Sequence, residues 1–212
     1  MERVYFELES GEKIMPYETF GIFLKAYDAL PPTPKTYMVD IEGADGSIDL
    51  SEWTGDIHFQ NRIVSVQLLD TIGNNSSVLS KIIGQKCKIY FSDDMDYYYV
   101  GRCNDSNIST RRHISDITLS FMCDPWKYCK GETVIALSVT GNGIDINLRS
   151  KRKPVIPSVV LTASCNLIWE NNTYNLDAGT YNPHWLVVKD TAKTLNVSGS
   201  GIITLRWRDG VI

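Results

Sequence analysis

The stretch IIGQKCKIYFSDDMDYYYVGR, residues 82–102, carries the signals that decide the fold. It predicts the end of a helix, a glycine stop, a strand, an acidic turn and a second, aromatic strand. The helix is predicted from two apolar i, i+4 pairs, with a cap at Asn74 to Ser77 and a stop at Gly84; the pairs are Val78/Ile82 and Leu79/Ile83. A helix this short needs a sheet to lie on, so the segment indicates one helix packed on β-structure.

Strand signals continue on both sides of this stretch. Upstream, we predict strands at 35–41, 47–53 and 56–69, with the turn Glu42-Gly43-Ala44-Asp45-Gly46 between the first two. The apolar phase of 56–69 slips near Asn61-Arg62, which suggests a bulge because a strand has period two. Downstream, 85–92, 97–109 and 112–123 are further strands, and Asp124-Pro125 is expected to break the last one.

The character of the sequence changes beyond this break. From Thr133 onward short strands alternate with turn signals about every ten residues, with no convincing helix, which is typical of a small β-sandwich. The predicted strands lie at 144–148, 154–164, 166–176, 184–190, 193–198 and 202–207. We therefore predict a mainly β protein with two domains, an N-terminal α+β domain over 1–130 and a C-terminal β-sandwich over 131–212.

Composition and charge narrow the functional classes. The 212 residues are 43% hydrophobic and carry a formal net charge of -4, which argues against nucleic-acid binding because phosphates need a basic surface. The best basic cluster, Lys151-Arg152-Lys153, is interpreted as a solvated linker. We expect no secretory signal and no membrane span, and synthesis in the cytosol. The five cysteines form no metal-ligand pair and are predicted to be free, mostly buried thiols, namely Cys87, Cys103, Cys123, Cys129 and Cys165.

Motifs that would carry chemistry are missing from the sequence. The three histidines, His58, His113 and His184, stand in no metal-binding spacing, and no nucleophile elbow or phosphate-binding loop occurs. Gly199-Ser200-Gly201 is interpreted as a hairpin turn. We predict that the protein is not an enzyme and has no catalytic, cofactor-binding or metal-binding residues and no cofactor. Tyr97-Tyr98-Tyr99 places rings on both faces of one strand, which predicts burial on both sides or a subunit contact.

Three stretches, taken in order and spacing over residues 37–128, resemble the distal tail proteins of siphophages. The first runs from Val39 to Leu50 with its Gly-x-Asp-Gly turn and is followed by Phe59-Gln60-Asn61-Arg62. The second is the stretch 82–102 quoted above. The third is Leu119 to Pro125, which matches the end of the family's N-terminal domain, and the closing segment Gly201 to Arg208 resembles the family's last strand.

The resemblance implies a structural role in the virion. The family's N-terminal "belt" domain assembles into a ring, typically six-fold, around a central channel at the distal tip of a long non-contractile tail, and a galectin-like β-sandwich lies outside it. Expected partners are further copies of the chain, the tail tube protein and the tail-associated lysin or tip protein, with the receptor-binding and tape measure proteins as additional contacts. DNA would cross the channel without specific binding, and we expect Asp93, Asp94 or Asp96 to face that channel.

Two other interpretations stay open at this stage. One is a carbohydrate-binding module that acts through the C-terminal sandwich, which predicts an exposed Trp185 or Trp169 beside polar groups. The other is a related tail-tube or baseplate protein, because such proteins share N-terminal architecture with the distal tail family.

Overall fold

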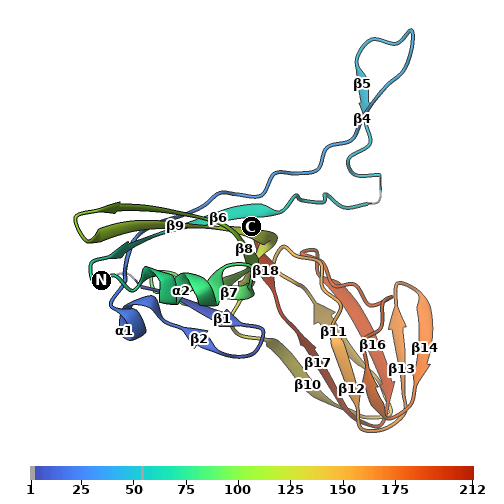
Figure 1. The fold of residues 1–212 in the computed structure, drawn as a ribbon. Coiled ribbons are helices and arrows are strands. Elements are labelled where there is room, and N and C mark those ends of the chain that lie inside the picture. The colour runs from blue at the N-terminus through green and yellow to red at the C-terminus, as the bar shows by residue number, and fades with distance from the viewer. Residues whose placement is uncertain (1–2, 54) are drawn as a thin grey trace. The chain divides into compact units, whose positions relative to one another are not determined.

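The computed structural model describes residues 3–53 and 55–212, and the chain divides into two compact units. The first unit extends to Lys127 and includes Ile212, and the second runs from Tyr128 to Val211 (Figure 1). Strands make up 56% of the chain and helices 6%, so the predicted mainly β class is confirmed. None of the helices in the described part of the chain is long and apolar enough to cross a membrane.

One antiparallel sheet with the strand order β2-β1-β7-β8-β9-β6-β3 organises the first unit. Its strands alternate buried and exposed residues, as in β6, where Arg62, Val64, Val66, Leu68 and Asp70 are buried and every second residue is more open. The strands are β1 (Val4–Leu8), β2 (Lys13–Ile14), β3 (Phe23–Ala29), β6 (Arg62–Asp70), β7 (Lys86–Phe91), β8 (Tyr97–Arg111) and β9 (Ile114–Cys129).

The predicted helix is present as α2 (Asn75–Ile82), whose Val78, Leu79 and Ile82 are buried against the sheet. Gly84 follows with a positive φ of 74°, as a helix stop requires. The expectation of a single helix is wrong, because α1 (Pro16–Phe20) forms a second, five-residue helix. Such a turn of helix has too few residues for an apolar period, and Pro16 at its start and Gly21 at its end were the available signals.

Several predicted strand limits differ from the structure. The strands predicted over 35–41 and 47–53 shorten to β4 (Met38–Asp40) and β5 (Ser47–Asp49). The strand expected over 56–69 begins only at Arg62, and the slip in apolar phase marks the point where the chain joins the sheet rather than a bulge. Asp124-Pro125 does not end β9, which continues to Cys129. The pairing of β9 with β6 runs only from Ser115 to Cys123, so beyond Cys123 no ladder to β6 needs the N–H group that proline lacks.

The second unit is a sandwich of two four-stranded antiparallel sheets, ordered β10-β17-β12-β15 and β11-β16-β13-β14. The predicted small β-sandwich is therefore confirmed. Its core lies between the sheets and includes Leu167, Trp169, Leu195 and Trp207. Its eight strands are β10 (Thr133–Val139), β11 (Ile144–Leu148), β12 (Ser158–Leu161), β13 (Cys165–Trp169), β14 (Asn172–Leu176), β15 (Gly179–Tyr181), β16 (Lys193–Gly199) and β17 (Gly201–Trp207). The short strand β18 (Gly210–Val211) is not part of the sandwich and pairs with β9.

Two strands predicted in the sandwich are wrong. Residues 166–176 form a hairpin, β13 and β14, that turns at Glu170 and Asn171, whose φ angles are 49° and 68°. Two consecutive left-handed residues define the tight turn that suits a hairpin, but Glu is not a usual residue for its first position, so the sequence did not reveal it. Residues 184–190 form no strand and contribute only the isolated bridge between Val155 and Val188.

Candidate assembly surface

The chain leaves the sheet of the first unit after β3 and returns at β6, and residues 30–61 between them form an arm. Its tip is the hairpin of β4 (Met38–Asp40) and β5 (Ser47–Asp49), and Figure 1 shows the two halves of the arm running together away from β6. Backbone hydrogen bonds join the halves nearer the base, from Lys35 N to His58 O at 2.7 Å and from Gln60 N to Thr33 O at 2.8 Å.

The arm has no core of its own. No described residue from 33 to 61 is buried, although the segment carries many large apolar side chains. Trp53 is 81% exposed and Tyr37 is 61% exposed, and Leu30, Met38, Ile41, Ile48 and Ile57 are also exposed. The arm therefore leaves most of its large apolar side chains uncovered within the single chain.

A shallow hollow lies on the arm below its tip. It encloses about 230 Å³ and is lined in part by Tyr37, Leu50, Trp53 and His58. Its shape is held by Ser51, whose amide donates to Asp49 Oδ1 at 2.8 Å and whose hydroxyl accepts from Tyr37 N at 2.8 Å. The hydrogen bonds from Ser51 lower the pKa of Asp49 below its usual value.

Arg62 fixes the base of the arm to the sheet. Its side chain is 5% exposed, and the guanidinium donates from Nε to Leu30 O and from Nη2 to Ala29 O, both at 2.9 Å. The guanidinium carbon lies 5.1 Å from the ring centroid of Tyr99, a cation–π arrangement. A longer contact of 3.5 Å reaches Pro125 O. Arg62 therefore ties together the strand that leaves for the arm and the strand that returns from it.

Two carboxylates of the acidic turn between β7 and β8 bind side chains of the first unit. Asp93 Oδ2 accepts a hydrogen bond of 2.6 Å from the hydroxyl of Tyr27, and Asp94 forms an ion pair with Lys127. Burial and then the bond to Asp93 raise the pKa of Tyr27. The Tyr27 ring also stacks on Phe91 at 3.7 Å between centroids. Two of the three carboxylates expected at a channel thus have structural partners within the chain.

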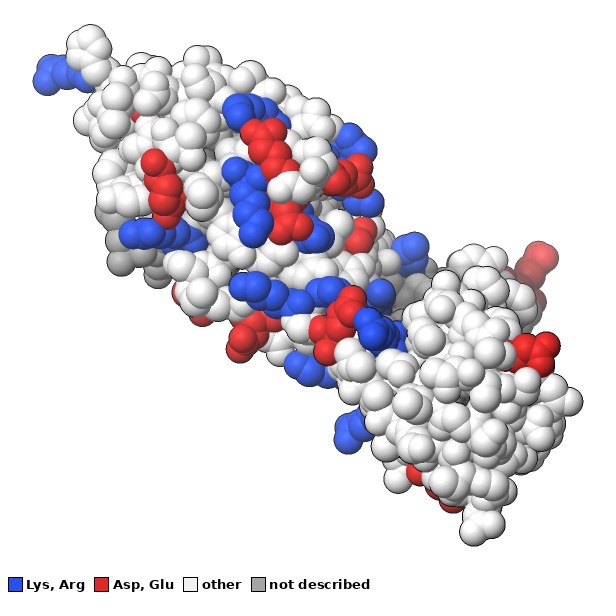
Figure 2. All heavy atoms as spheres, turned by 90° about the horizontal axis from the view of Figure 1, so that it is seen from below, with Lys and Arg blue, Asp and Glu red and all other residues white. Residues whose placement is uncertain are grey.

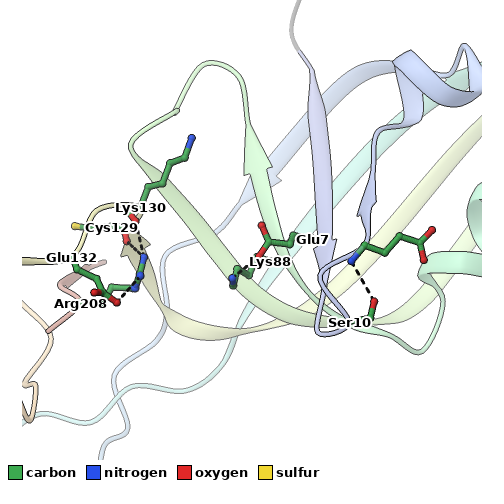
Figure 3. A network of polar contacts seen from close by, with 8 residues as sticks. Glu7, Ser10, Lys88, Cys129, Lys130, Glu132 and Arg208 are labelled. Atoms are coloured by element: carbon green, nitrogen blue, oxygen red, sulfur yellow. Dashed lines mark hydrogen bonds and ion pairs between the residues drawn. The ribbon is translucent and has the colours of Figure 1, made fainter. Parts of the chain in front are cut away.

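The face of the sheet opposite the core of the first unit carries a row of tyrosines beside paired charges. Tyr98 and Tyr99 are each 6% exposed on opposite faces of β8, so the predicted burial of both faces is confirmed. Tyr98 lies 5.1 Å from Tyr90, which stacks on Tyr5 at 4.4 Å. Next to them Lys88 pairs with Glu7 at 2.6 Å (Figure 3), and the hydrogen bond from Lys88 holds the pKa of Glu7 below its ordinary value.

Charges of opposite sign interleave over the face of the molecule seen in Figure 2. The first unit contains several ion pairs between residues far apart in the chain, among them Lys88–Glu7, Lys81–Glu12, Lys25–Asp116 and Arg3–Glu18. A surface of alternating sign offers no continuous basic track to a phosphate backbone.

The cysteines are mostly buried, and the three histidines lie apart from one another. Cys87, Cys103, Cys123 and Cys165 are buried free thiols and Cys129 is half-buried, so the prediction of free, mostly buried thiols is confirmed. Burial raises the pKa of Cys87 and of Cys123 to about 12. His58 lines the hollow on the arm, while His113 and His184 are exposed at other places in the chain. Within the described residues, no group of three or more His, Cys, Asp or Glu side chains could hold a metal ion.

The tryptophans considered for sugar stacking differ in exposure. Trp169 is 2% exposed in the core of the sandwich and cannot stack on a ligand. Trp185 is half-buried and lies face to face on Tyr174, with 3.6 Å between centroids and 1° between planes. One face of its ring is therefore already covered.

The chain thus combines a β-rich first unit with a small β-sandwich. Among solved structures it is similar to SPP1 Dit (gp 19.1), described as a paradigm of the hub adsorption apparatus in phages that infect Gram-positive bacteria. The TM-score is 0.67 over 100% of both chains, at 13% sequence identity. The resemblance to siphophage distal tail proteins is thus confirmed as a likeness of fold. No protein-family model and no curated protein sequence matches the chain.

Proposed function

We propose that the chain is a structural hub component of a long non-contractile phage tail, where copies of its first unit form a six-fold ring at the distal tip. The observation that carries the proposal is the arm, which exposes apolar side chains on a fold shared over its full length with SPP1 Dit. The exposed apolar side chains of the arm need another protein surface to cover them. A neighbouring copy of the chain supplies such a surface. A head-to-tail contact of this kind closes into a ring when the rotation that relates one copy to the next divides a full turn evenly.

The proposed ring joins the tail tube on one side to the tip on the other. Its partners would be the tail tube protein, the tail-associated lysin or tip protein, the receptor-binding protein and the tape measure protein. DNA would cross its channel unbound, in keeping with the net charge of -4 and the alternating surface charge. In this proposal residues 1–130 form the ring and residues 131–212 lie outside it, and the chain works in the virion without catalysis.

The proposal is tested by the mass of the protein in solution, measured by light scattering over a range of concentrations. We expect a ring-sized species, and we expect Trp53→Ser to reduce it without lowering stability, because Trp53 is 81% exposed. Ile168→Ser, which removes a 38% exposed apolar side chain from the sandwich, serves as the matched control. Electron microscopy of intact tails with antibody-labelled protein then shows whether the protein lies at the distal tip. Absence of the chain from purified tails would disprove the proposal.

A second candidate, saccharide binding by the sandwich, rests on Trp185 alone, since Trp169 is buried. Trp185 is half-buried, packs against the core of the sandwich and stacks on Tyr174, so a sugar ring could cover only the part of its ring that stays exposed. A glycan array probed with the full chain tests it. Hits that disappear in Trp185→Ala would support this candidate, and an array without hits would eliminate it.

A further inference from the structure

The arm carries more negative charge than the chain as a whole. Residues 30–61 hold one basic residue, Lys35, and six carboxylates, which are Asp40, Glu42, Asp45, Asp49, Glu52 and Asp56. The formal charge of the arm is therefore -5, against -4 for the whole chain, so all other residues together carry +1. Glu42, Asp45 and Glu52 are exposed and form no ion pair with any residue that the structure describes.

A cluster of basic residues lies at the turn between β8 and β9. Arg111, Arg112 and His113 follow one another there, and we call them the basic turn. All three are exposed, and their side chains make no hydrogen bond or ion pair within the described part of the chain. Other basic side chains of the first unit are paired with carboxylates, among them Lys25, Lys81 and Lys88.

The backbone of the basic turn has a conformation that its residues do not favour. The φ angles of Arg112 and His113 are 47° and 72°, so both residues lie in the left-handed region. A two-residue hairpin turn of this kind is usually built from Asn and Gly, because most side chains clash with the backbone there. Arg and His therefore destabilise the turn relative to Asn-Gly, and such strain points to a function at the same residues.

The arm and the basic turn lie at opposite ends of one pair of strands. In the ladder between β6 and β9, Arg62 faces Cys123 at the arm end, and Asp70 faces Ser115 next to the basic turn. At about 3.4 Å per residue, the two ends of this ladder are about 27 Å apart. The arm runs away from β6 on the side opposite the basic turn (Figure 1), so it cannot reach the basic turn of its own chain.

Exposed apolar side chains accompany the charges on both surfaces. Tyr37 and Trp53 are exposed on the arm, and Ile108 and Ile114 are exposed beside the basic turn. Each surface thus combines apolar groups with unpaired charges of one sign, and the two signs are opposite. Arginine suits such a contact, because its guanidinium can bind a carboxylate through two parallel hydrogen bonds.

We infer that the acidic arm of one copy binds the basic turn of the next copy, with Glu42, Asp45 and Glu52 facing Arg111 and Arg112. The inference rests on the proposed ring and names the two surfaces that meet in it. The surfaces differ and lie at opposite ends of the first unit. Each copy can therefore use both at once, one toward each neighbour, which makes the contact head-to-tail.

Charge reversal tests the contact in the full chain. Arg111→Glu with Arg112→Glu should weaken association about tenfold in sedimentation velocity, because like charges then meet. Glu42→Lys with Asp45→Lys should do the same from the side of the arm. An equimolar mixture of the two double variants should restore association, because every arm again meets a basic or acidic turn of opposite sign.

Two further measurements separate the contact from a fault in folding. Arg112→Asn with His113→Gly relaxes the turn, so this variant should have a higher Tm than the wild type. It should nevertheless associate about threefold more weakly, because it lacks an interacting charge. Raising the ionic strength from about 0.1 M to about 1 M shortens the Debye length from about 10 Å to about 3 Å and should weaken wild-type association.

The control is Lys13→Glu with Arg206→Glu, which changes the net charge as the first variant does, at exposed positions of β2 and β17. It should leave association unchanged, and equal weakening by this control would overturn the inference. A ring that both charge-reversed variants still form at wild-type mass would overturn the contact and leave the ring in place. A wild-type chain that stays a single copy at every concentration would disprove the contact together with the ring.

Discussion

Replacing Arg62 with lysine should destabilise the first unit by about 3 kcal/mol and loosen the arm. Arg62 makes two 2.9 Å hydrogen bonds from a buried guanidinium to the carbonyls of Ala29 and Leu30. A hydrogen bond to a charged group contributes roughly 1.5–3 kcal/mol, and the stacking on Tyr99 adds about 1 kcal/mol. Lysine keeps the charge but lacks the planar fork, so it can replace about one of the two bonds and leaves a buried carbonyl without its partner.

Thermal unfolding followed by circular dichroism and peptide-resolved hydrogen exchange measures this effect. A loss of about 3 kcal/mol in a unit of this size corresponds to a fall in Tm of roughly 10 °C. Exchange should accelerate at the arm base, where Gln60 N bonds to Thr33 O, and the sandwich should be unaffected. Arg206→Lys, at an exposed position of β17, is the control. A change below about 0.5 kcal/mol for Arg62→Lys would show that the guanidinium does not hold the arm, and that the assembly role assigned to the arm needs another anchor.

Other expectations follow from the buried groups of the first unit. Gly101→Ala should destabilise the protein by about 1–3 kcal/mol in chemical denaturation, because the added carbon would lie 2.4 Å from Cys123 Sγ and 2.7 Å from Met122 O; Gly131→Ala, with nothing within 4 Å, should be neutral, and equal effects would refute the packing argument. A thiol reagent should modify Cys129 in the native protein and all five cysteines in denaturant, and rapid native labelling of Cys123 would contradict the burial found here. The raised pKa of the buried thiols, about 12 for Cys123, means that they stabilise the fold fully below about pH 9 and that this contribution is lost between pH 9 and 12. Equilibrium unfolding at pH 7 to 11 checks the direction, and a stability that rises over this range would contradict it.

Much of the local structure could be predicted from the sequence. The alternation in Val64, Val66 and Leu68 indicates a half-buried strand, and Val78 with Ile82 indicates the face of α2 that packs on the sheet. The arm was harder to predict from the sequence. The apolar residues of the arm resemble strand residues, so the segment 56–61 was predicted to continue the strand of β6, and only the slip in phase at Arg62 indicated otherwise.

The β class, the position of α2 and the change of character near residue 130 can be read from the amino-acid sequence, because these depend on the period of neighbouring residues. Only the tertiary structure decided that residues 30–61 leave the sheet, that Arg62 holds them, and that β10 lies at an open edge. The reason is that strand order and exposure depend on pairings between residues far apart in the chain. The strand Thr133–Val139 would have the same sequence in the middle of a sheet, and its partner β17 lies more than sixty residues further along.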